Sequence, residues 1–273
     1  MKVVLFCGGY GMRLREYSEN IPKPMVPIGY RPILWNIMKY YAHFGHKDFI
    51  LCLGYKADVI KNYFVNYDEY ISNDFVFENG GADLKLLNSD IHDWKITFVD
   101  TGLSSNIGER LVAVKPHLEG EEMFLANYTD GLTDLPLPEM ITQFKQEDKT
   151  AMFMACQPTH SFHVVKLKDD NRVASISHIG NSGLWVNAGY FILKHEIFDY
   201  INKGEELVNE PFQRLIAEGK LGAYPYGGSW LSMDTFKEKQ MLDDMYTAGN
   251  VPWEVWREQK KNKNAENAKA RTQ

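Results

Sequence analysis

The sequence predicts an α/β fold: a Rossmann-like, mostly parallel sheet sandwiched by helices, with a β-rich lobe inserted in the C-terminal half. Three observations support this class. Short apolar runs of strand length alternate with amphipathic helical patterns through about the first 150 residues. Strand patterns separated by turns replace them afterwards. The chain has 273 residues, 44% of them hydrophobic and 24% charged, which is enough to bury one sizeable core.

The elements of the first half follow from apolar periodicity and from end signals. Residues 2–6 are a β-branched run that predicts a buried strand. Residues 31–45 place apolar side chains on one helical face, begin with Pro32 and stop at Gly45, so they predict an amphipathic helix. In such sheets ligands bind beyond the carboxyl ends of the strands. The other elements predicted here are strands at 48–53, 95–99 and 123–127 and helices at 57–64 and 108–118.

After residue 150 the sequence predicts the β-rich lobe. Neither an internal repeat nor a linker-like stretch interrupts the chain, so we expect its two parts to share one core within a single domain, residues 1–256. Strands are predicted at 151–156, 164–168, 173–177 and 185–193, and helical patterns return at 211–218 and 237–248.

Charge separates the body of the chain from its end. The net charge is −6, and residues 257–273 carry six basic and two acidic side chains, so residues 1–256 stand at −10. A body this acidic does not bind nucleic acid non-specifically, and any phosphate-bearing ligand must be held by a few local cations or a metal ion. The basic polar tail, 257–273, is expected to be solvated and disordered.

Membrane and disulfide classes are disfavoured. No apolar run reaches membrane-spanning length, and the N-terminus enters a strand without a signal-peptide layout, so we expect a cytoplasmic protein with no membrane partner. Cys7, Cys52 and Cys156 each lie in an apolar run without metal-ligand spacing. They are predicted to be buried, reduced thiols.

A glycine-rich loop follows the first strand. Gly8, Gly9 and Gly11 let the backbone approach a ligand closely and turn several N–H groups toward one point, which suits phosphate oxygens, although a plain turn has the same composition. The dinucleotide fingerprint is excluded because Leu14 stands where its third glycine belongs, and no Walker lysine follows. Lys23 comes next, clamped between two prolines on a stiff segment that aims its ammonium.

These motifs resemble the sugar nucleotidyltransferase superfamily, and within it the glucose-1-phosphate cytidylyltransferase branch. The glycine loop reads GGYGMRL, and PKP follows at 22–24. The resemblance runs in register from residue 1 to about 256. The further segments that carry it are 28–35, 54–56, 99–102 with 104–105, 108 and 110–111, then 130–131, 187–189, 233–235 and 252–253.

The resemblance implies an enzyme that condenses CTP with a sugar-1-phosphate, releasing pyrophosphate and forming a CDP-sugar. Residues 1–150 would form its nucleotide-binding half and 151–256 its acceptor-binding half. Arg13 would hold the departing β- and γ-phosphates and Lys23 the α-phosphate, so positioning and electrostatics would dominate catalysis. The cradle for the nucleotide would consist of Gly8, Gly9, Gly11 and Met12.

The same resemblance implies a metal cofactor and an oligomer. Asp130 and Asp234 would ligate Mg²⁺, which supplies the positive charge that the acidic body lacks. Without the resemblance, an aspartate before Gly131 is equally well explained as a turn former. Relatives in this branch form trimers or hexamers, so a homo-oligomer is expected.

Base choice is expected to depend on the stretch 99–111. Cytosine presents an amine donor where uracil and thymine present a carbonyl, so discrimination needs hydrogen-bond acceptors placed against that amine. The inference of CTP rests on similarity of this stretch to the cytidylyltransferases. The contacts it implies are Thr101, Gly102, Ser104 and Arg110.

The chain departs from the family pattern on the acceptor side. A Glu-Lys-Pro triplet that holds the sugar and its phosphate is replaced by His-Ile-Gly at 178–180. A Phe-Gly pair reads Phe162-His163, and the glycine before the metal aspartate is Thr129. Because the triphosphate-side motifs are retained, the acceptor is expected to be different or its pocket remodelled.

Nearby polar residues are candidates to replace the missing contacts to the acceptor. A zinc site formed by His160, His163 and His178 is disfavoured because residues three apart on a strand point to opposite faces and no fourth ligand is evident. Lys166 or Lys168 is an alternative source of the missing cation, although both also fit a solvated surface. The acceptor residues we expect are Tyr128, His163, His178 and Asn187.

Two rival functions remain at this stage. One is a nucleotidyltransferase for another phosphorylated acceptor. The other is a catalytically silent homologue that binds nucleotide sugars and has lost the acceptor lysine. Retention of Arg13, Lys23, Asp130 and Asp234 favours an enzyme, since a binding module has less need of two metal carboxylates.

Overall fold

The fold is described from a computed structural model in residues 1–9, 21–158 and 162–257. The predictions for Gly11, Met12, Arg13, His160 and the tail beyond Arg257 lie outside these residues.

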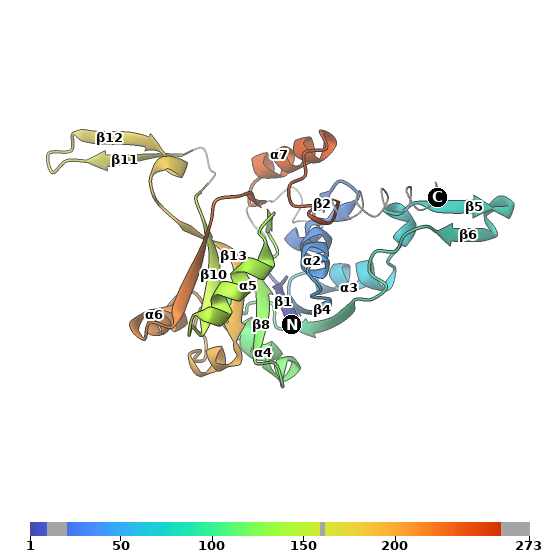
Figure 1. Ribbon diagram of the computed structural model, residues 1–273, viewed down its shortest axis with the longest axis horizontal. Coiled ribbons are helices and arrows are strands. Elements are labelled where there is room, and N and C mark those ends of the chain that lie inside the picture. The colour runs from blue at the N-terminus through green and yellow to red at the C-terminus, as the bar shows by residue number, and fades with distance from the viewer. Residues whose placement is uncertain (10–20, 159–161, 258–273) are drawn as a thin grey trace, which may run out of the picture.

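One twisted sheet forms the centre of the molecule (Figure 1). The four strands of its nucleotide-side half run parallel, and each was predicted from the sequence: β1 (Lys2–Phe6), β4 (Asp48–Leu53), β7 (Lys95–Asp100) and β8 (Met123–Asn127). Their carboxyl ends therefore lie along one edge. The sheet continues through β13 (Val186–Lys194), β10 (Ala151–Cys156) and β14 (Leu221–Tyr226), in the order β14-β10-β13-β8-β1-β4-β7.

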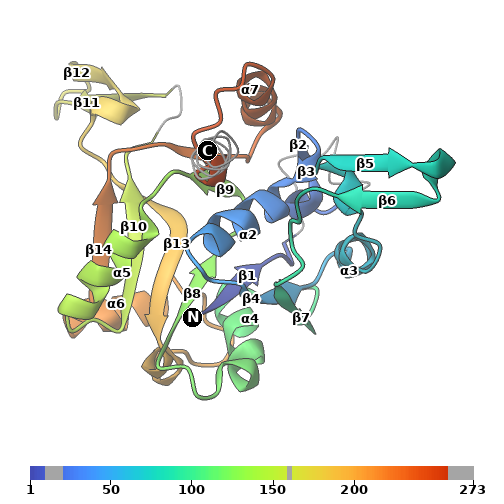
Figure 2. The ribbon, with the colours of Figure 1, turned by 45° about the vertical axis from the view of Figure 1, so that its right-hand side comes forward.

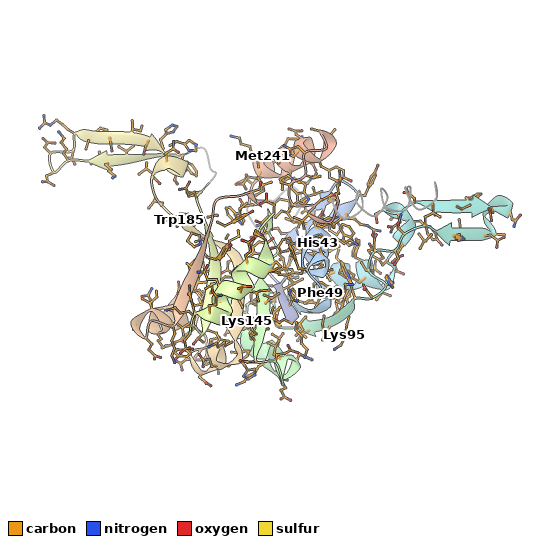
Figure 3. The ribbon with its side chains drawn as sticks, viewed as in Figure 1. His43, Phe49, Lys95, Lys145, Trp185 and Met241 are labelled. Carbon is orange, nitrogen blue, oxygen red and sulfur yellow. The ribbon has the colours of Figure 1, made fainter. Side chains whose placement is uncertain are left out.

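Helices cover both faces of this sheet, as predicted (Figure 2). Alternation along β1 divides the core: Val3 and Leu5 pack on one face, and Val4 and Phe6 on the other. Phe49 of β4 lies buried on the first face, in the middle of the molecule in Figure 3. On that face lie α2 (Ile33–His43), α3 (Ala57–Val65), α5 (Leu137–Gln146) and α7 (Phe236–Thr247), and on the other α4 (Ile107–Val114) and α6 (Glu210–Ala217).

The β-rich half extends the central sheet more than it separates from it. Of the strands predicted there, β10 and β13 join the sheet. Only β11 (His163–Leu167) and β12 (Val173–His178) leave it, as an antiparallel hairpin that projects from the body (Figure 1). Figure 3 shows Trp185 near the base of this projection. The extension begins at β8, because β13 pairs antiparallel with β8 along the whole length of β8.

Several short elements were not predicted. A second hairpin, β5 (Phe75–Glu78) and β6 (Asp83–Leu86), projects at the opposite end of the molecule (Figure 1). Helix α5 was missed as well, although Pro138 stands in its first turn. Two-residue pairings form β2 (Pro27–Ile28) with β3 (Arg31–Pro32). The 3₁₀ turns are Lys23–Met25, Glu69–Ile71, Asn79–Gly81, Lys115–Leu118, Ile179–Asn181 and His195–Asp199.

The three cysteines are buried and unpaired, as predicted. Burial raises the pKa of the Cys7 thiol to about 12 and also raises that of Cys52. These thiols are therefore core side chains rather than nucleophiles. Within the described residues, no helix is both long and apolar enough to cross a membrane.

We expect Gly189→Ala to destabilise the protein by about 2 kcal/mol or more. Gly189 has φ of +78°, and an added Cβ would lie 2.7 Å from the Tyr128 ring. Gly120→Ala is the matched control, because Gly120 has φ of +82° with open space around it. Urea denaturation should show the larger loss for Gly189→Ala; equal losses would mean that only the backbone angle matters.

Candidate active site

A cavity of about 520 Å³ opens where β1 and β8 end. This is the edge at which the sequence predicts ligand binding. Seven lining residues coincide with the predicted site, and five of them are Gly8, Gly9, Lys23, Arg110 and Asp130. Tyr128 and Asp234, also predicted, complete that group. The remaining lining residues are Phe6, Cys7, Pro24, Ser105, Asn106, Ile107, Thr129 and Glu206.

The Lys23 ammonium lies between two carboxylates. Its Nζ donates to Asp234 Oδ1 at 2.7 Å and to Asp130 Oδ2 at 2.9 Å. Pro22 precedes the 3₁₀ turn that carries it, and Pro24 lies within that turn, so the backbone is stiff there as predicted. The structure thus brings together three predicted site residues that are far apart in the sequence.

Backbone pairing holds the two carboxylates in place. Strand β9 (Gly131–Thr133) begins directly after Asp130 and pairs with β15 (Trp230–Ser232), which ends just before Asp234. The Met233 N–H also donates to the Asp130 carbonyl at 2.8 Å. At the start of α7, Glu238 accepts from the N–H groups of Asp234 and Thr235, at 2.7 and 2.9 Å. The Asp130 and Asp234 carboxylates therefore converge because a two-strand ribbon and a capping box align their backbones.

Charge coupling sets the protonation of this cluster. Burial lowers the pKa of Lys23, but the Asp130 and Asp234 carboxylates outweigh it, and the net pKa is raised. Burial raises the pKa of Asp130, an effect that the Lys23 charge opposes. The two carboxylates remain about a third exposed to the cavity, at 34% and 29%. Lys23 therefore stays cationic at neutral pH, beside carboxylates that a ligand can reach.

The Arg110 side chain links the carboxyl ends of three parallel strands through hydrogen bonds. It is 3% exposed, and its guanidinium donates to the carbonyls of Leu53 and Gly8, each at 3.1 Å, and to Thr101 Oγ1 at 2.7 Å. Leu53 is the last residue of β4, and Gly8 and Thr101 follow β1 and β7. An added Cβ at Gly8 would lie 2.0 Å from an Arg110 nitrogen, so a larger residue there would displace the guanidinium. Arg110 is thus placed as a brace under the glycine loop.

The other residues predicted to read the base do not line the cavity. Thr101 is buried and donates to the Leu53 carbonyl at 2.8 Å, so it serves the same brace as Arg110. Gly102 and Ser104 are exposed beside it. Ser105, Asn106 and Ile107 line the cavity in their place. The predicted stretch therefore reaches the site through its second half, because α4 begins there and turns its first residues toward the cavity.

Thr129 adopts a backbone conformation that is rare for a β-branched residue. Its φ is +65°, in the left-handed region that favours glycine. The Thr129 N–H donates to Asn127 Oδ1 and its hydroxyl to the Phe6 carbonyl, both at 2.8 Å. These bonds hold the strained turn that presents Asp130. The positive φ of Thr129 also accounts physically for the glycine that the family pattern places at this position.

The predicted acceptor residues divide into two groups. Tyr128 lines the cavity, and the Asn187 side chain lies close to its hydroxyl. His163 and His178 are exposed cross-strand partners on the projecting hairpin, with ring centroids 5.7 Å apart. Neither histidine lines the cavity. Within the described part of the chain, no three His, Cys, Asp or Glu side chains group as a metal site.

Lys166, Lys168 and Ile179 also belong to this hairpin region. The two lysines are exposed, and Ile179 is half-buried with its N–H donating to the Phe162 carbonyl at 2.9 Å. None of the three lines the cavity. Lys166 and Lys168 therefore do not replace the acceptor lysine at the Lys23 cavity.

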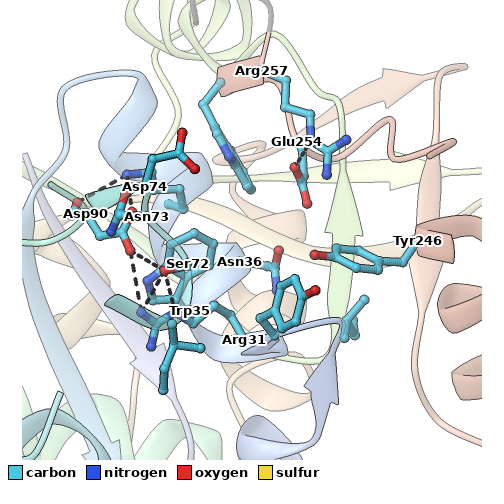
Figure 4. Close-up of a pocket in the computed structure, with 15 residues that line it drawn as sticks. Arg31, Trp35, Asn36, Ser72, Asn73, Asp74, Asp90, Tyr246, Glu254 and Arg257 are labelled. Atoms are coloured by element: carbon cyan, nitrogen blue, oxygen red, sulfur yellow. Dashed lines mark hydrogen bonds and ion pairs between the residues drawn. The ribbon is translucent and has the colours of Figure 1, made fainter. Parts of the chain in front are cut away.

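A second, larger cavity of about 640 Å³ lies beside the start of α2 (Figure 4). Its charges are paired with one another. Arg31 and Lys39 lie 3.6 and 3.7 Å from the Asp90 carboxylate, and Arg257 pairs with Glu254. Arg31 also donates to Ser72 Oγ at 2.9 Å. This cavity does not contain the predicted site residues Lys23, Asp130 and Asp234, which line the cavity at the ends of β1 and β8, so we assign the chemistry to the Lys23 cavity.

Comparison with known proteins shows which family and which relatives this chain is similar to. The sequence profile of the family described as Nucleotidyl transferase matches residues 2–237. Glucose-1-phosphate cytidylyltransferase of Salmonella typhimurium is 37% identical over 257 residues, covering 94% of this chain and all of that protein. A probable glucose-1-phosphate cytidylyltransferase of Bacillus subtilis is 33% identical, with the same coverage.

Solved structures share the fold at lower identity. HddC from Yersinia pseudotuberculosis superimposes with a TM-score of 0.65 at 21% identity, covering 90% of this chain and 99% of that one. A UDP-glucose pyrophosphorylase solved with UDP-glucose gives a TM-score of 0.66 at 16% identity, covering 91% and 98%. These structures support the α/β architecture and the layered sheet described above.

We expect Arg110→Met to lower the free energy of unfolding by about 1–3 kcal/mol, because three acceptors around the buried guanidinium each lose one hydrogen bond. Arg172→Met is the control, since Arg172 pairs with Asp170 on the exposed hairpin, where such pairs contribute about 0–1 kcal/mol. Denaturant titration of both variants measures the difference. A loss no larger than that of the control would show that Arg110 is not a brace.

Proposed function

The chain belongs to the nucleotidyl transferase family, and from this premise we propose that it condenses CTP with a sugar-1-phosphate to give a CDP-sugar and pyrophosphate. The acceptor is glucose-1-phosphate or a related sugar phosphate. The observation that carries the proposal is the convergence of Lys23, Asp130 and Asp234 at the carboxyl end of a parallel sheet. Two relatives at 37% and 33% identity, named as cytidylyltransferases, support the choice of CTP.

The reaction joins two polyanions. A phosphate oxygen of the sugar-1-phosphate attacks the α-phosphorus of CTP, the bond from that phosphorus to the bridging oxygen of the β-phosphate breaks, and pyrophosphate leaves. Charge must be stabilised where it develops, which a fixed ammonium does well. We assign Lys23 to the α-phosphate and Arg13 to the departing phosphates. The nucleotide cradle would be formed by the backbone of Gly8, Gly9, Gly11 and Met12.

The residues present fit a divalent cation. Enzymes of this family generally use one, and we propose Mg²⁺ held by Asp130 and Asp234. Their oxygens already converge on a single cationic group, they remain partly exposed to the cavity, and carboxylates are the ligands that a hard cation prefers. When bound, the ion supplies positive charge to the phosphates. The ammonium of Lys23, relieved of neutralising both carboxylates, would then be available to phosphate.

A second candidate function is nucleotidyl transfer to a different phosphorylated acceptor. We propose Tyr128 and Asn187 as acceptor contacts, and His163 and His178 as residues that would act only if the hairpin approaches the substrate. Ile179 stands where the family pattern has the lysine that binds the acceptor phosphate, and neither Lys166 nor Lys168 lines the cavity. This observation favours another phosphorylated acceptor. A cytoplasmic location and a homo-oligomer of three or six chains remain predictions.

Pyrophosphate release tests this function directly. The four common nucleoside triphosphates are each combined with a panel of phosphorylated acceptors, with and without Mg²⁺. Turnover should be greatest with CTP and a hexose-1-phosphate and should require the metal. Efficient turnover with a different triphosphate, or binding of nucleotide sugars without turnover of any pair, would overturn the proposal in favour of one of the rival functions.

Lys23→Ala is expected to lower kcat/KM by about 10- to 150-fold or more, because a charge-assisted contact contributes about 1.5–3 kcal/mol before transition-state effects. Arg13→Ala should behave similarly. Lys85→Ala is the matched control, because Lys85 is exposed on β6 and does not line the cavity. Steady-state kinetics measure kcat/KM, and circular dichroism shows whether each variant is folded. A folded Lys23→Ala enzyme with normal turnover would remove Lys23 from the phosphate site.

Asp130→Asn and Asp234→Asn are expected to lose activity together with its dependence on Mg²⁺. An amide keeps the size of the side chain but lacks the anionic oxygen that a hard cation prefers. Calorimetric titration with Mg²⁺ and CTP measures the affinity, and Asp170→Asn serves as an exposed control. Unchanged metal affinity in both variants would show that the two carboxylates only hold the ribbon together.

A further inference from the structure

One carboxylate in the cavity wall is not explained by the Lys23 cluster. Glu206 lies between the end of β13 and the start of α6, and it lines the same cavity as Lys23 and Tyr128. Its Oε2 accepts from the Ile107 N–H at 3.2 Å. Its Oε1 is buried and has no hydrogen-bond partner among the described residues.

The backbone around Glu206 is firmly anchored. Glu205 accepts from Arg214 at 2.7 Å, and the Gly204 carbonyl accepts from Asn106 Nδ2 at 2.9 Å. Leu207 is fully buried in the core on the α4 side of the sheet. Gly108 of α4 permits this close approach, since an added Cβ would lie 2.2 Å from the Glu205 carbonyl. The Glu206 side chain is therefore presented by a fixed backbone.

Helix capping does not account for this carboxylate. The start of α4 already carries a complete capping box, in which Asn106 and Glu109 satisfy each other's N–H groups at 2.9 and 3.0 Å. The bond from Ile107 engages only one Glu206 oxygen. A carboxylate oxygen left buried without a donor is costly, so its retention in a cavity wall indicates a donor that arrives with a ligand.

Charge restricts what that ligand group is. The carboxylates of Asp130 and Asp234 share the Lys23 ammonium, whereas no ion pair of Glu206 occurs among the described residues. Burial raises the pKa of Glu206, the backbone N–H groups of Ile107 and Leu207 oppose this rise, and the charges of Glu210 and Glu109 add to it, so that the net pKa is raised. Burial and then the Glu206 charge also raise the pKa of the neighbouring Tyr128. A phosphate would be repelled from this wall, so a neutral N–H or O–H group is the fitting partner.

We propose that Glu206 is a specificity-determining residue, whose free carboxylate oxygen accepts a hydrogen bond from a neutral N–H or O–H donor of a bound substrate. This assignment rests on the proposed function. The donor is the exocyclic amine of cytosine, a ribose hydroxyl or a hydroxyl of the acceptor sugar. All three share one chemistry, and substrate analogues distinguish them.

The test compares Glu206→Gln with Glu210→Gln. Glu210 begins α6, is exposed and does not line the cavity, so its variant controls for loss of a nearby charge. Glutamine is nearly isosteric with Glu206 and can still accept from the Ile107 N–H. We expect Glu206→Gln to raise the KM for one substrate about 10- to 150-fold while kcat changes less than about threefold, and Glu210→Gln to leave both unchanged.

Analogues identify the donor through the same measurement. The Glu206→Gln effect should disappear with UTP if the donor is the cytosine amine, with 2′- or 3′-deoxy-CTP if it is ribose, or with one deoxyglucose-1-phosphate if it is the sugar. A KM change below twofold for both substrates overturns the proposal. So does a lowered Tm with unchanged KM, which would indicate a structural role, or an effect that persists with every analogue.

Failure of the proposed function is recognised separately. If the native protein releases no pyrophosphate from CTP and any sugar-1-phosphate, the proposed function fails. Calorimetric Kd values for CTP and for glucose-1-phosphate alone then report on Glu206. A tenfold weaker Kd in Glu206→Gln, relative to Glu210→Gln, would support the residue's role without turnover, and equal Kd values would overturn it.

Discussion

Two carboxylates that point at one place repel each other, and in this molecule the Lys23 ammonium holds them together. Its partners lie 107 and 211 residues away in the sequence. The contacts are short and partly buried, where the effective dielectric is lower than in water and charges interact strongly. The cluster is therefore both a structural junction and a chemical site. Any cation that takes over the carboxylates changes the state of the lysine as well.

The scaffold around this junction is arranged to keep its geometry when ligands of high charge enter. The β9–β15 ribbon aligns the backbones of both aspartates, and the strained turn at Thr129 fixes the approach to Asp130. Arg110 ties together the loops after three parallel strands with neutral acceptors. Because the buried Arg110 guanidinium is bound to carbonyls, it adds positive charge next to the glycine loop without forming an ion pair with a carboxylate among the described residues. Positioning residues thus surround the cluster on both sides of the cavity.

Local patterns predicted much of this arrangement. Every strand of the parallel half follows from apolar runs, whereas the roles of Lys23, Asp130 and Asp234 were implied by the resemblance of their motifs to a known family. The β9–β15 ribbon and the β5–β6 hairpin could not be predicted in this way, because pairings of three and four residues leave almost no periodicity in the sequence. Glu206 was missed for another reason. In the sequence it is one of two adjacent glutamates before a helix, a pattern typical of a solvated surface, and only packing of Gly108 against its neighbour turns it inward.

In the proposed function the two ends of the cavity act differently on a substrate. A metal ion held by Asp130 and Asp234 would leave the Lys23 ammonium available to phosphate, whereas the wall formed by Glu206 and Tyr128 would repel phosphate and accept neutral donors. A substrate that carries phosphate at one end and hydroxyl or amine groups at the other has only one favourable direction of entry. The glycine loop and Lys23 then act on the part that all nucleotide substrates share. Discrimination among bases or sugars is left to the opposite wall, which is where this chain departs from simple phosphate recognition.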